Sequence, residues 1–273
     1  MSSHVNNKVS AAGLLIALGI IYGDIGTSPL YVFNAILKGK VVSDLLILGS
    51  LSLVIWTLTL QTTIKYVILT LRADNRGEGG IFSLFALVRR RRKWLVFAAM
   101  IGGAALLADG MITPPISVTS AIEGLRNIPF LHRIPDHTIV GIVLAILAAL
   151  FFVQQFGTAS IGKMFGPIMT GWFLMLAILG ATHLIPHIHI FKAFNPYYGI
   201  EVLINYPHGF WILGAIFLCT TGAEALYSDL GHCGKGNIRV SWVMVKSCLI
   251  LNYLGQGAWL LANYKGRLIT EDM

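Results

Sequence analysis

The chain has 273 residues, of which 56% are hydrophobic and 12% are charged, and its mean hydropathy is +0.74. A soluble domain carries roughly 25% charged residues, so the composition excludes an ordinary soluble protein and indicates an all-α polytopic membrane protein. The formal net charge of +8 does not indicate nucleic acid. The densest basic run, 89–93, lies beside hydrophobic stretches, and basic–aromatic alternation is missing, so we predict a lipid bilayer and no nucleic acid as partner.

Hydrophobic stretches of the length needed to cross a membrane follow one another along the whole chain. A spanning helix needs roughly 20 mostly apolar residues, which predicts about seven spans in a single transmembrane domain, 1–273. The predicted spans are 11–37, 45–71, 94–121, 138–153, 164–185, 209–227 and 240–262. The connecting segment 72–93 contains an apolar stretch, 81–88, that is too short to span and is consistent with an interfacial helix. Its Gly77–Gly80 run predicts a tight turn, with a gating contact as the alternative.

The loops predict the orientation. The loop between the second and third spans carries Arg72, Arg76 and the basic run 89–93. Because Lys and Arg concentrate in cytoplasmic loops, we predict that this loop and the N-terminus are cytoplasmic. We expect no removable signal peptide, because the first span lacks a small-residue cleavage site. The chain's cysteines are too few and too scattered for a disulfide framework or a zinc site.

The first and sixth spans are each interrupted beside an acid. Gly23, Asp24 and Pro29 lie within span 11–37, and Gly222 and Glu224 lie within span 209–227. Broken helices at corresponding positions are typical of transporters built from inverted repeats. The spacing predicts a first five-helix repeat over about 11–185 and the start of a second over about 209–262.

Asp24, Asp109 and Glu224 are the carboxylates that lie well inside predicted spans. An ionised carboxylate in hydrocarbon is costly, so each is a candidate functional group. Thr113 follows Asp109 by four positions and Thr221 precedes Glu224 by three, so each pair shares a helix face. Such clusters of oxygen atoms suit hard cations.

The alternative is that these acids pair with cations and only hold helices together. Lys65 and Lys246 are the candidate partners inside spans, and the acids outnumber them. Some carboxylates must therefore be protonated or neutralised by a bound cation. Asp24 also argues against a substrate that carries a carboxylate, because broken first helices bind that group through free backbone N–H groups. The pattern favours a cation. Trp172 is interpreted as an interfacial or packing aromatic residue.

Several motifs identify a family. They are 22–31 (YGDIGTSPLY), 72–80 (RADNRGEGG), 112–118 (ITPPISV) with 120–125 (SAIEGL), 222–232 (GAEALYSDLGH) and 251–258 (LNYLGQGA). In this order and at this length they resemble the KUP/HAK/KT potassium-uptake permeases, closest to the bacterial members, over nearly the whole chain from about residue 11.

The resemblance implies a potassium–proton symporter, not an enzyme, in the cytoplasmic (inner) membrane, with a LeuT-like, APC-type inverted-repeat fold and broken helices 1 and 6. It implies K⁺ and H⁺ as transported ions and no cofactor or other metal, and it leaves a homodimer open. The implied potassium ligands are Asp24, Tyr31, Asp109, Thr113, Thr221 and Glu224, and the implied proton-coupling acids are Glu224 and Asp24. Asp109 stands where some bacterial members carry Glu, which keeps an acid there.

The chain departs from the family pattern in length, because members typically have about twelve spans. The fold is therefore expected to be incomplete, and we expect the 273-residue chain alone not to transport. The alternative functions are a cation-coupled carrier of an organic solute and an ion channel. An intramembrane enzyme is disfavoured because the sequence shows neither a paired-metal motif nor a nucleophile motif.

Overall fold

The computed structural model describes residues 9–89, 94–128, 134–154 and 159–270, and within these ranges the chain is helical, with isolated β-bridges and no extended strand. The helices, in chain order, are α1 (Ala11–Ile21), η1 (Ser28–Leu30), α2 (Val32–Leu37), α3 (Asp44–Thr57), η2 (Leu58–Leu69), η3 (Thr70–Arg72), α4 (Ile81–Val88), α5 (Leu95–Glu123), η4 (Gly124–Asn127), α6 (Asp136–Gln154), α7 (Ala159–Leu184), η5 (Ile188–Phe194), α8 (Pro196–Asn205), α9 (Gly209–Phe217), η6 (Leu218–Thr220), α10 (Ala225–Ser228), α11 (Leu230–Cys233) and α12 (Lys235–Tyr264).

In the described part of the chain, 5 helices are long and apolar enough to cross a membrane by themselves: Asp44–Arg72, Leu95–Arg126, Asp136–Val153, Met164–Leu184 and Gly209–Ser228. They coincide with five of the predicted spans. The first predicted span is divided into short helices, and α1 alone has 11 residues. Helix α12 has 30 residues, but polar residues such as Lys246, Asn252 and Gln256 lower its hydropathy. A total of seven spans stays a prediction.

The break in the first span is present where the sequence predicts it. Helix α1 begins after Ser10, whose side chain accepts a hydrogen bond from the Gly13 N–H, and it ends at Ile21. The chain then runs through turns to the short 3₁₀ helix η1 before α2 begins at Val32. Pro29 favours the interruption because it has no N–H to donate. The segment 22–31 therefore crosses the protein interior without regular α-helix.

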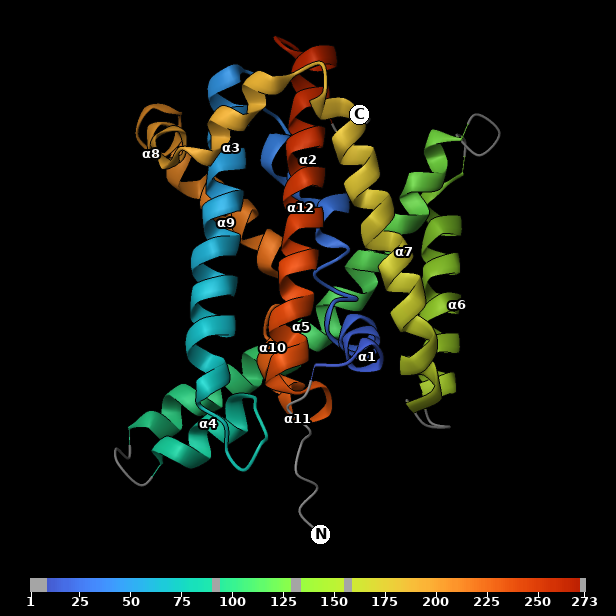
Figure 1. Cartoon of the computed structure of the whole chain (residues 1–273). Coiled ribbons are helices and arrows are strands. Elements are labelled where there is room, and N and C mark those ends of the chain that lie inside the picture. Colours follow the sequence, from blue (N-terminus) through green and yellow to red (C-terminus); the bar gives the residue numbers. More distant parts are fainter. Residues whose placement is uncertain (1–8, 90–93, 129–133, 155–158, 271–273) are drawn as a thin grey trace.

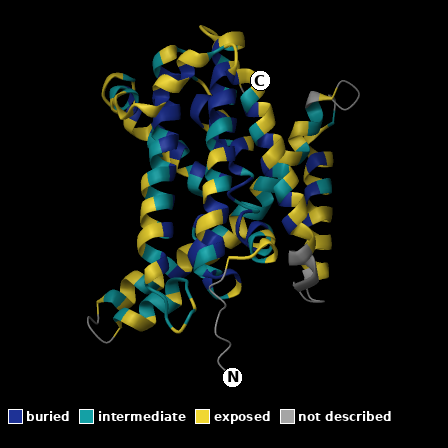
Figure 2. Ribbon diagram, in the orientation of Figure 1, coloured by how far each residue is buried: buried dark blue, intermediate teal, exposed yellow. Residues whose placement is uncertain are grey.

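Helices α3, α7 and α12 form the centre of the molecule. Helix α12 packs against both α7 and α3, and α1 packs against α7 (Figure 1). Buried residues concentrate along α12 and its neighbours, whereas α6 and the outer surface of α7 are largely exposed (Figure 2). Exposed apolar faces are expected in a protein whose surroundings are lipid.

Tyr22, the residue just before the break, is fully buried in this core. Its hydroxyl donates to the Ile238 carbonyl oxygen at 3.1 Å and lies 2.9 Å from Ser241 Oγ. Its ring stacks on Trp242 of α12 and meets Phe173 of α7 edge-on, each with centroids 6.3 Å apart. These contacts attach the start of the break to the two central helices.

Helix α3 continues into η2, which is wound as a π-helix over Leu58–Leu69. A π-helix is rare in proteins, and where one occurs it often lies at a functional site. Here the wider turns present Thr59 and Thr63, which accept hydrogen bonds from Lys246 Nζ at 3.0 and 3.1 Å. The charge of Lys246 is thus met by hydroxyl groups.

Helix α5 is continuous from Leu95 to Glu123, although it contains Pro114 and Pro115. It runs obliquely across the molecule from α4 toward α6 (Figure 1), and 6% of its most apolar stretch is buried. Proline cannot donate to the carbonyl four residues earlier, so the Gly110 and Met111 carbonyls lose their helical partners. Both carbonyls follow directly after Asp109.

Candidate cation site

The three acids predicted from the sequence come together. One carboxylate oxygen from each of Asp24, Asp109 and Glu224 lies within 4.8 Å of the other two, and all three residues are half-buried. They come from the break in the first span, from the middle of α5, and from the turn before α10. Ionised carboxylates this close repel one another, so the group favours a bound cation, a proton, or both.

The carboxylate of Asp24 has an oxygen atom that lacks a hydrogen-bond partner among the described residues. Its Oδ1 is buried and has no hydrogen-bond partner within the described part of the chain. A buried polar atom without a partner loses its hydration without compensation, and the cost is larger for a charged group. A cation, a proton or a water molecule at this atom would supply the missing partner.

The two breaks touch each other at Gly222. This residue has φ +82, and a Cβ placed on it would lie 2.7 Å from Asp24 Cβ and 2.9 Å from Asp24 Oδ2. Glycine meets both requirements, since it adopts positive φ readily and has no side chain. The predicted interruption of the sixth span is also present, because α9 ends at Phe217, η6 ends at Thr220 and α10 begins only at Ala225.

The predicted hydroxyl ligands lie beside the acids. Thr113 donates to Asp109 Oδ1 at 2.9 Å, as expected for residues four apart on a helix. The Tyr31 hydroxyl lies 3.3 Å from Ser28 Oγ and interacts with Thr221. Thr221 itself donates to the Leu218 carbonyl oxygen at 2.9 Å, which leaves its oxygen lone pairs free to act as acceptors.

The three acids have no basic partner within the described residues. The ion pairs recorded there are Arg126–Asp136, His232–Asp229, Lys235–Asp74 and Lys265–Asp44. Lys246 is bound by threonines, and Lys65 Nζ lies 4.8 Å from the centroid of the Tyr66 ring. These contacts do not support the alternative in which Lys65 or Lys246 neutralises the acids.

Sequence reasoning missed several residues around the site. Ser117 lies 3.2 Å from Thr27 Oγ1 and connects α5 to the break; its position four residues after Thr113 could have indicated it. Trp172 and Gln256 donate to break carbonyls, from Nε1 to Gly26 O and from Nε2 to Pro29 O. Sequence reasoning interpreted Trp172 as an interfacial or packing aromatic residue, and no local pattern connects either residue with segment 22–31.

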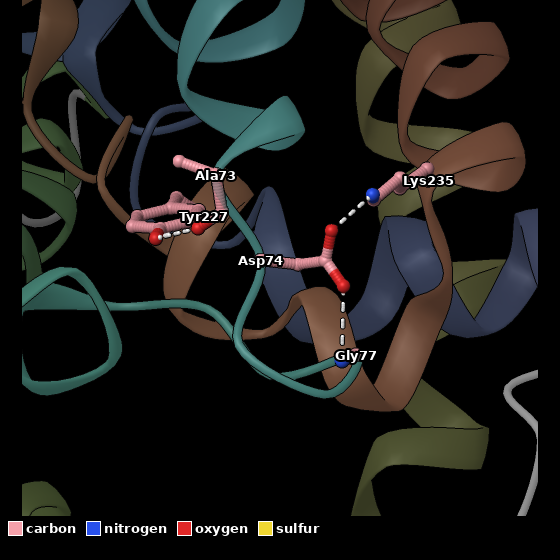
Figure 3. A network of polar contacts seen from close by, with 5 residues as sticks. All are labelled: Ala73, Asp74, Gly77, Tyr227 and Lys235. Atoms are coloured by element: carbon pink, nitrogen blue, oxygen red, sulfur yellow. Dashed lines mark hydrogen bonds and ion pairs between the residues drawn. The ribbon is translucent and has the colours of Figure 1, made fainter. Parts of the chain in front are cut away.

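The loop 72–80 lies against the end of the sixth span, as Figure 3 shows. Tyr227 donates to the Ala73 carbonyl oxygen at 2.5 Å, and Lys235 Nζ lies 2.6 Å from Asp74 Oδ1. Asp74 Oδ2 accepts from the Gly77 N–H at 3.0 Å, which closes the turn. A tight turn is present, but it spans Asn75–Glu78 and thus begins before the predicted Gly77–Gly80 run. The loop contacts the segment that follows Glu224 directly.

Within the described residues, 5 helices are long and apolar enough to span a membrane, and the broken first span meets the break in helix 209–228 beside three clustered acids. These features indicate a multi-pass membrane protein with a candidate cation site. Residues 11–268 match the family described as the K⁺ potassium transporter integral membrane domain, and the chain belongs to this family. The family consists of transporters, not enzymes.

Curated relatives agree with the family match. Over 275 residues the chain is 63% identical to the probable potassium transport system protein Kup of Cytophaga hutchinsonii, covering 99% of this chain and 41% of the relative. It is 57% identical to the protein of the same name from Flavobacterium psychrophilum, over 95% of this chain and 39% of the relative. The identity is also 57% to the probable potassium transport system protein Kup 1 of Lactococcus lactis subsp. lactis, over 94% of this chain and 40% of the relative. The chain thus spans about two fifths of the length of these relatives. No solved structure matches the chain significantly.

Proposed function

We propose that this chain forms the ion-binding part of a transporter that imports K⁺ together with H⁺ across the cytoplasmic membrane. One observation carries the proposal. Three carboxylate oxygens lie within 4.8 Å of one another, without a basic partner in the described residues, at the point where two broken helices meet. The relatives' printed names, which refer to potassium transport, support K⁺ as the ion.

The proposed ligands surround that point on three elements. Asp24 and Tyr31 flank the first break, Asp109 and Thr113 lie on α5, and Thr221 and Glu224 belong to the second break. Carboxylate and hydroxyl oxygens replace the water molecules around K⁺, as oxygen ligands do in ion-selective proteins. No further metal or cofactor is part of the proposal.

Proton coupling follows from the charge of the cluster. Three ionised carboxylates with one K⁺ keep a net negative charge, which resists enclosure in a medium of low dielectric constant. A proton on Glu224, with Asp24 as the second candidate, removes part of this charge. The closed, loaded state is therefore favoured when both ions are bound, which couples K⁺ entry to the inward proton gradient.

We further propose a LeuT-like inverted repeat, with the first repeat over about 11–185 and the second beginning at about 209. The contact between Gly222 and Asp24 supports it, because it brings the two broken helices together. The N-terminus and the loop 72–80 are proposed to be cytoplasmic, because the segment between the second and third spans carries Arg72, Arg76 and the basic run 89–93. A homodimer is compatible with this arrangement.

The test uses a chimera in which this chain replaces the matching segment of the Cytophaga hutchinsonii relative. In a bacterial strain without potassium uptake systems of its own, the chimera should restore growth at low K⁺ and accumulate rubidium. Uptake should fall when an uncoupler dissipates the proton gradient. Amine-sensitive uptake that does not respond to K⁺ would indicate the organic-solute carrier instead. Potassium flux that does not respond to the pH gradient at a fixed membrane potential would indicate a channel.

A further inference from the structure

The first break exposes backbone carbonyls that an α-helix would satisfy. In an α-helix each carbonyl accepts from the N–H four residues later. Here the Leu30 N–H donates to Thr27 O at 2.9 Å and the Tyr31 N–H to Ser28 O at 3.2 Å. The Gly26 carbonyl has therefore lost its helical donor. Because this segment is buried, each such carbonyl needs another partner.

Two side chains from different helices supply the donors. Trp172 of α7 donates from Nε1 to the Gly26 carbonyl oxygen at 2.8 Å. Gln256 of α12 donates from Nε2 to the Pro29 carbonyl oxygen at 3.0 Å. The two carbonyls lie between Asp24 and Tyr31, so the donors hold both ends of the stretch that connects two proposed ligands.

Gln256 is itself held in place, and Trp172 lies on a helix that packs closely against α12. Gln256 Nε2 also donates to Asn252 Oδ1 at 2.7 Å, and Asn252 Nδ2 donates to the Leu176 carbonyl oxygen at 3.0 Å. Helices α7 and α12 approach closely where Gly180 faces Gly255, and a Cβ on Gly255 would collide with the Gly180 backbone. Small residues at such a crossing allow close packing of membrane helices. The α7–α12 pair is thus a rigid frame that carries both donors.

We propose that Trp172 and Gln256 are positioning residues that set the shape of the ion site by capping the Gly26 and Pro29 carbonyls. Capping holds Asp24 and Tyr31 at a fixed separation. It also satisfies one lone pair of each carbonyl and fixes the direction of the other. The inference rests on the proposed function for its effect on transport, but its structural part is independent.

The transport test uses Trp172→Phe, which keeps an aromatic ring, and Gln256→Met, which keeps the length of the side chain. Trp259→Phe is the matched control, because Trp259 also lies on α12 and its ring packs against Tyr264. In the chimera, each test variant should raise the half-saturation concentration for K⁺ about five- to tenfold, the effect of one lost buried hydrogen bond. The maximal rate should change less, and the preference between potassium and rubidium should shift.

The double variant distinguishes a shared role from separate ones. Because both donors hold the same segment, the combined effect should be smaller than the product of the single effects. Unchanged half-saturation concentrations and ion preference in both single variants would overturn the inference. So would a loss confined to protein level and maximal rate, since that indicates a role in folding alone.

Hydrogen–deuterium exchange on the purified 273-residue chain tests the positioning without transport. The amides of 22–31 should exchange about tenfold faster in Trp172→Phe and Gln256→Met than in the unmodified chain or Trp259→Phe. If the chimera imports no K⁺ but this exchange accelerates, the proposed function fails and the positioning role stands. If uptake is normal and exchange is unchanged in the variants, the positioning role fails and the proposed function stands.

Discussion

Asp24, Asp109 and Glu224 repel one another unless positive charge lies among them, and their placement determines what the site can bind. Their oxygens lie within 4.8 Å, which is close enough for one monovalent cation to contact more than one of them. The Oδ1 of Asp24 is buried and has no hydrogen-bond partner within the described residues. These residues are therefore the first to test.

Neutral, isosteric replacement of two of these acids should abolish transport. In the chimera, Asp24→Asn removes a proposed ligand charge, and Glu224→Gln removes both a ligand charge and the proposed proton acceptor. Each should reduce rubidium uptake at least a hundredfold, a loss comparable to removing a partner of a buried charge, about 3–5 kcal/mol. Asp44→Asn is the control, because Asp44 is half exposed and pairs with Lys265 at a helix end. Near-normal uptake in either test variant would refute that residue's role.

Gly222 is expected to tolerate no side chain. Gly222→Ala forces a residue with Cβ to φ +82 and brings that Cβ to 2.7 Å from Asp24 Cβ. The conformational strain alone costs about 1–2 kcal/mol, and the contact displaces Asp24. The variant should lower the thermal unfolding temperature of the purified chain and weaken K⁺ binding, measured by calorimetry in detergent.

Gly214→Ala provides the matched comparison in the same span. Gly214 lies within α9, and a Cβ there would meet no atom within 4 Å. Alanine is the better helix former by about 1 kcal/mol, so stability should be unchanged or higher. Equal behaviour of the two variants would show that the contact at Gly222 is unimportant.

At the scale of elements, the loop 72–80 follows the second span in the chain and contacts the start of α12 through Asp74 and Lys235. The Asp74–Lys235 pair is partly buried, each side chain being 29% exposed. The hydrogen bond from Lys235 and that from the Gly77 N–H lower the pKa of Asp74 below its ordinary value of 3.8. A carboxyl group with a lowered pKa stabilises the docked loop above its ordinary pKa, and this contribution disappears as pH falls through the lowered value.

Removing either charge of the Asp74–Lys235 pair should free the loop 72–80 from its contact with α12. At neutral pH, Asp74→Asn and Lys235→Met should each increase deuterium exchange over 73–80, whereas exchange at α6 should not change. The unmodified loop should stay protected when the pH is lowered to about 4, because the pKa of Asp74 lies below that of a free carboxyl group. Exchange that is equal in the variants and the unmodified chain would exclude a docking role for this pair.

At the scale of the whole molecule, α5 contributes Asp109 and Thr113 to the site, yet only 6% of its most apolar stretch is buried within this chain. The wall of the site on this helix is therefore open to lipid or to other protein. The chain also covers 41% of the Cytophaga hutchinsonii relative. Both facts bear on what the 273 residues can do alone.

We expect the isolated chain to bind K⁺ but not to transport it. Transport needs gates that enclose the ion alternately from each side, and an exposed α5 leaves the site incompletely enclosed. In the strain lacking uptake systems, the 273-residue chain should give uptake at background level, whereas the chimera should accumulate rubidium. Robust uptake by the isolated chain, at equal expression, would contradict this expectation.

Much of this protein follows from the sequence alone. Its hydrophobicity determines that it is an all-helical membrane protein, because unsatisfied backbone groups are too costly in lipid. Glycine, proline and acid residues at 23–29 and 221–224 indicate where two spans break, because these are local backbone effects. The spacing of Asp109 and Thr113 likewise predicts their observed hydrogen bond. Sequence therefore determines the elements, the breaks and the candidate ligands.

The tertiary structure alone decides how these parts meet. The convergence of Asp24, Asp109 and Glu224 depends on the tilt and rotation of three helices, which no local pattern specifies. Trp172 and Gln256 reach carbonyls 146 and 227 residues away in the chain, so their donor roles appear only once α7 and α12 are packed. Backbone chemistry is local and can be inferred from neighbouring residues, whereas a binding site depends on distances between residues that packing alone brings together.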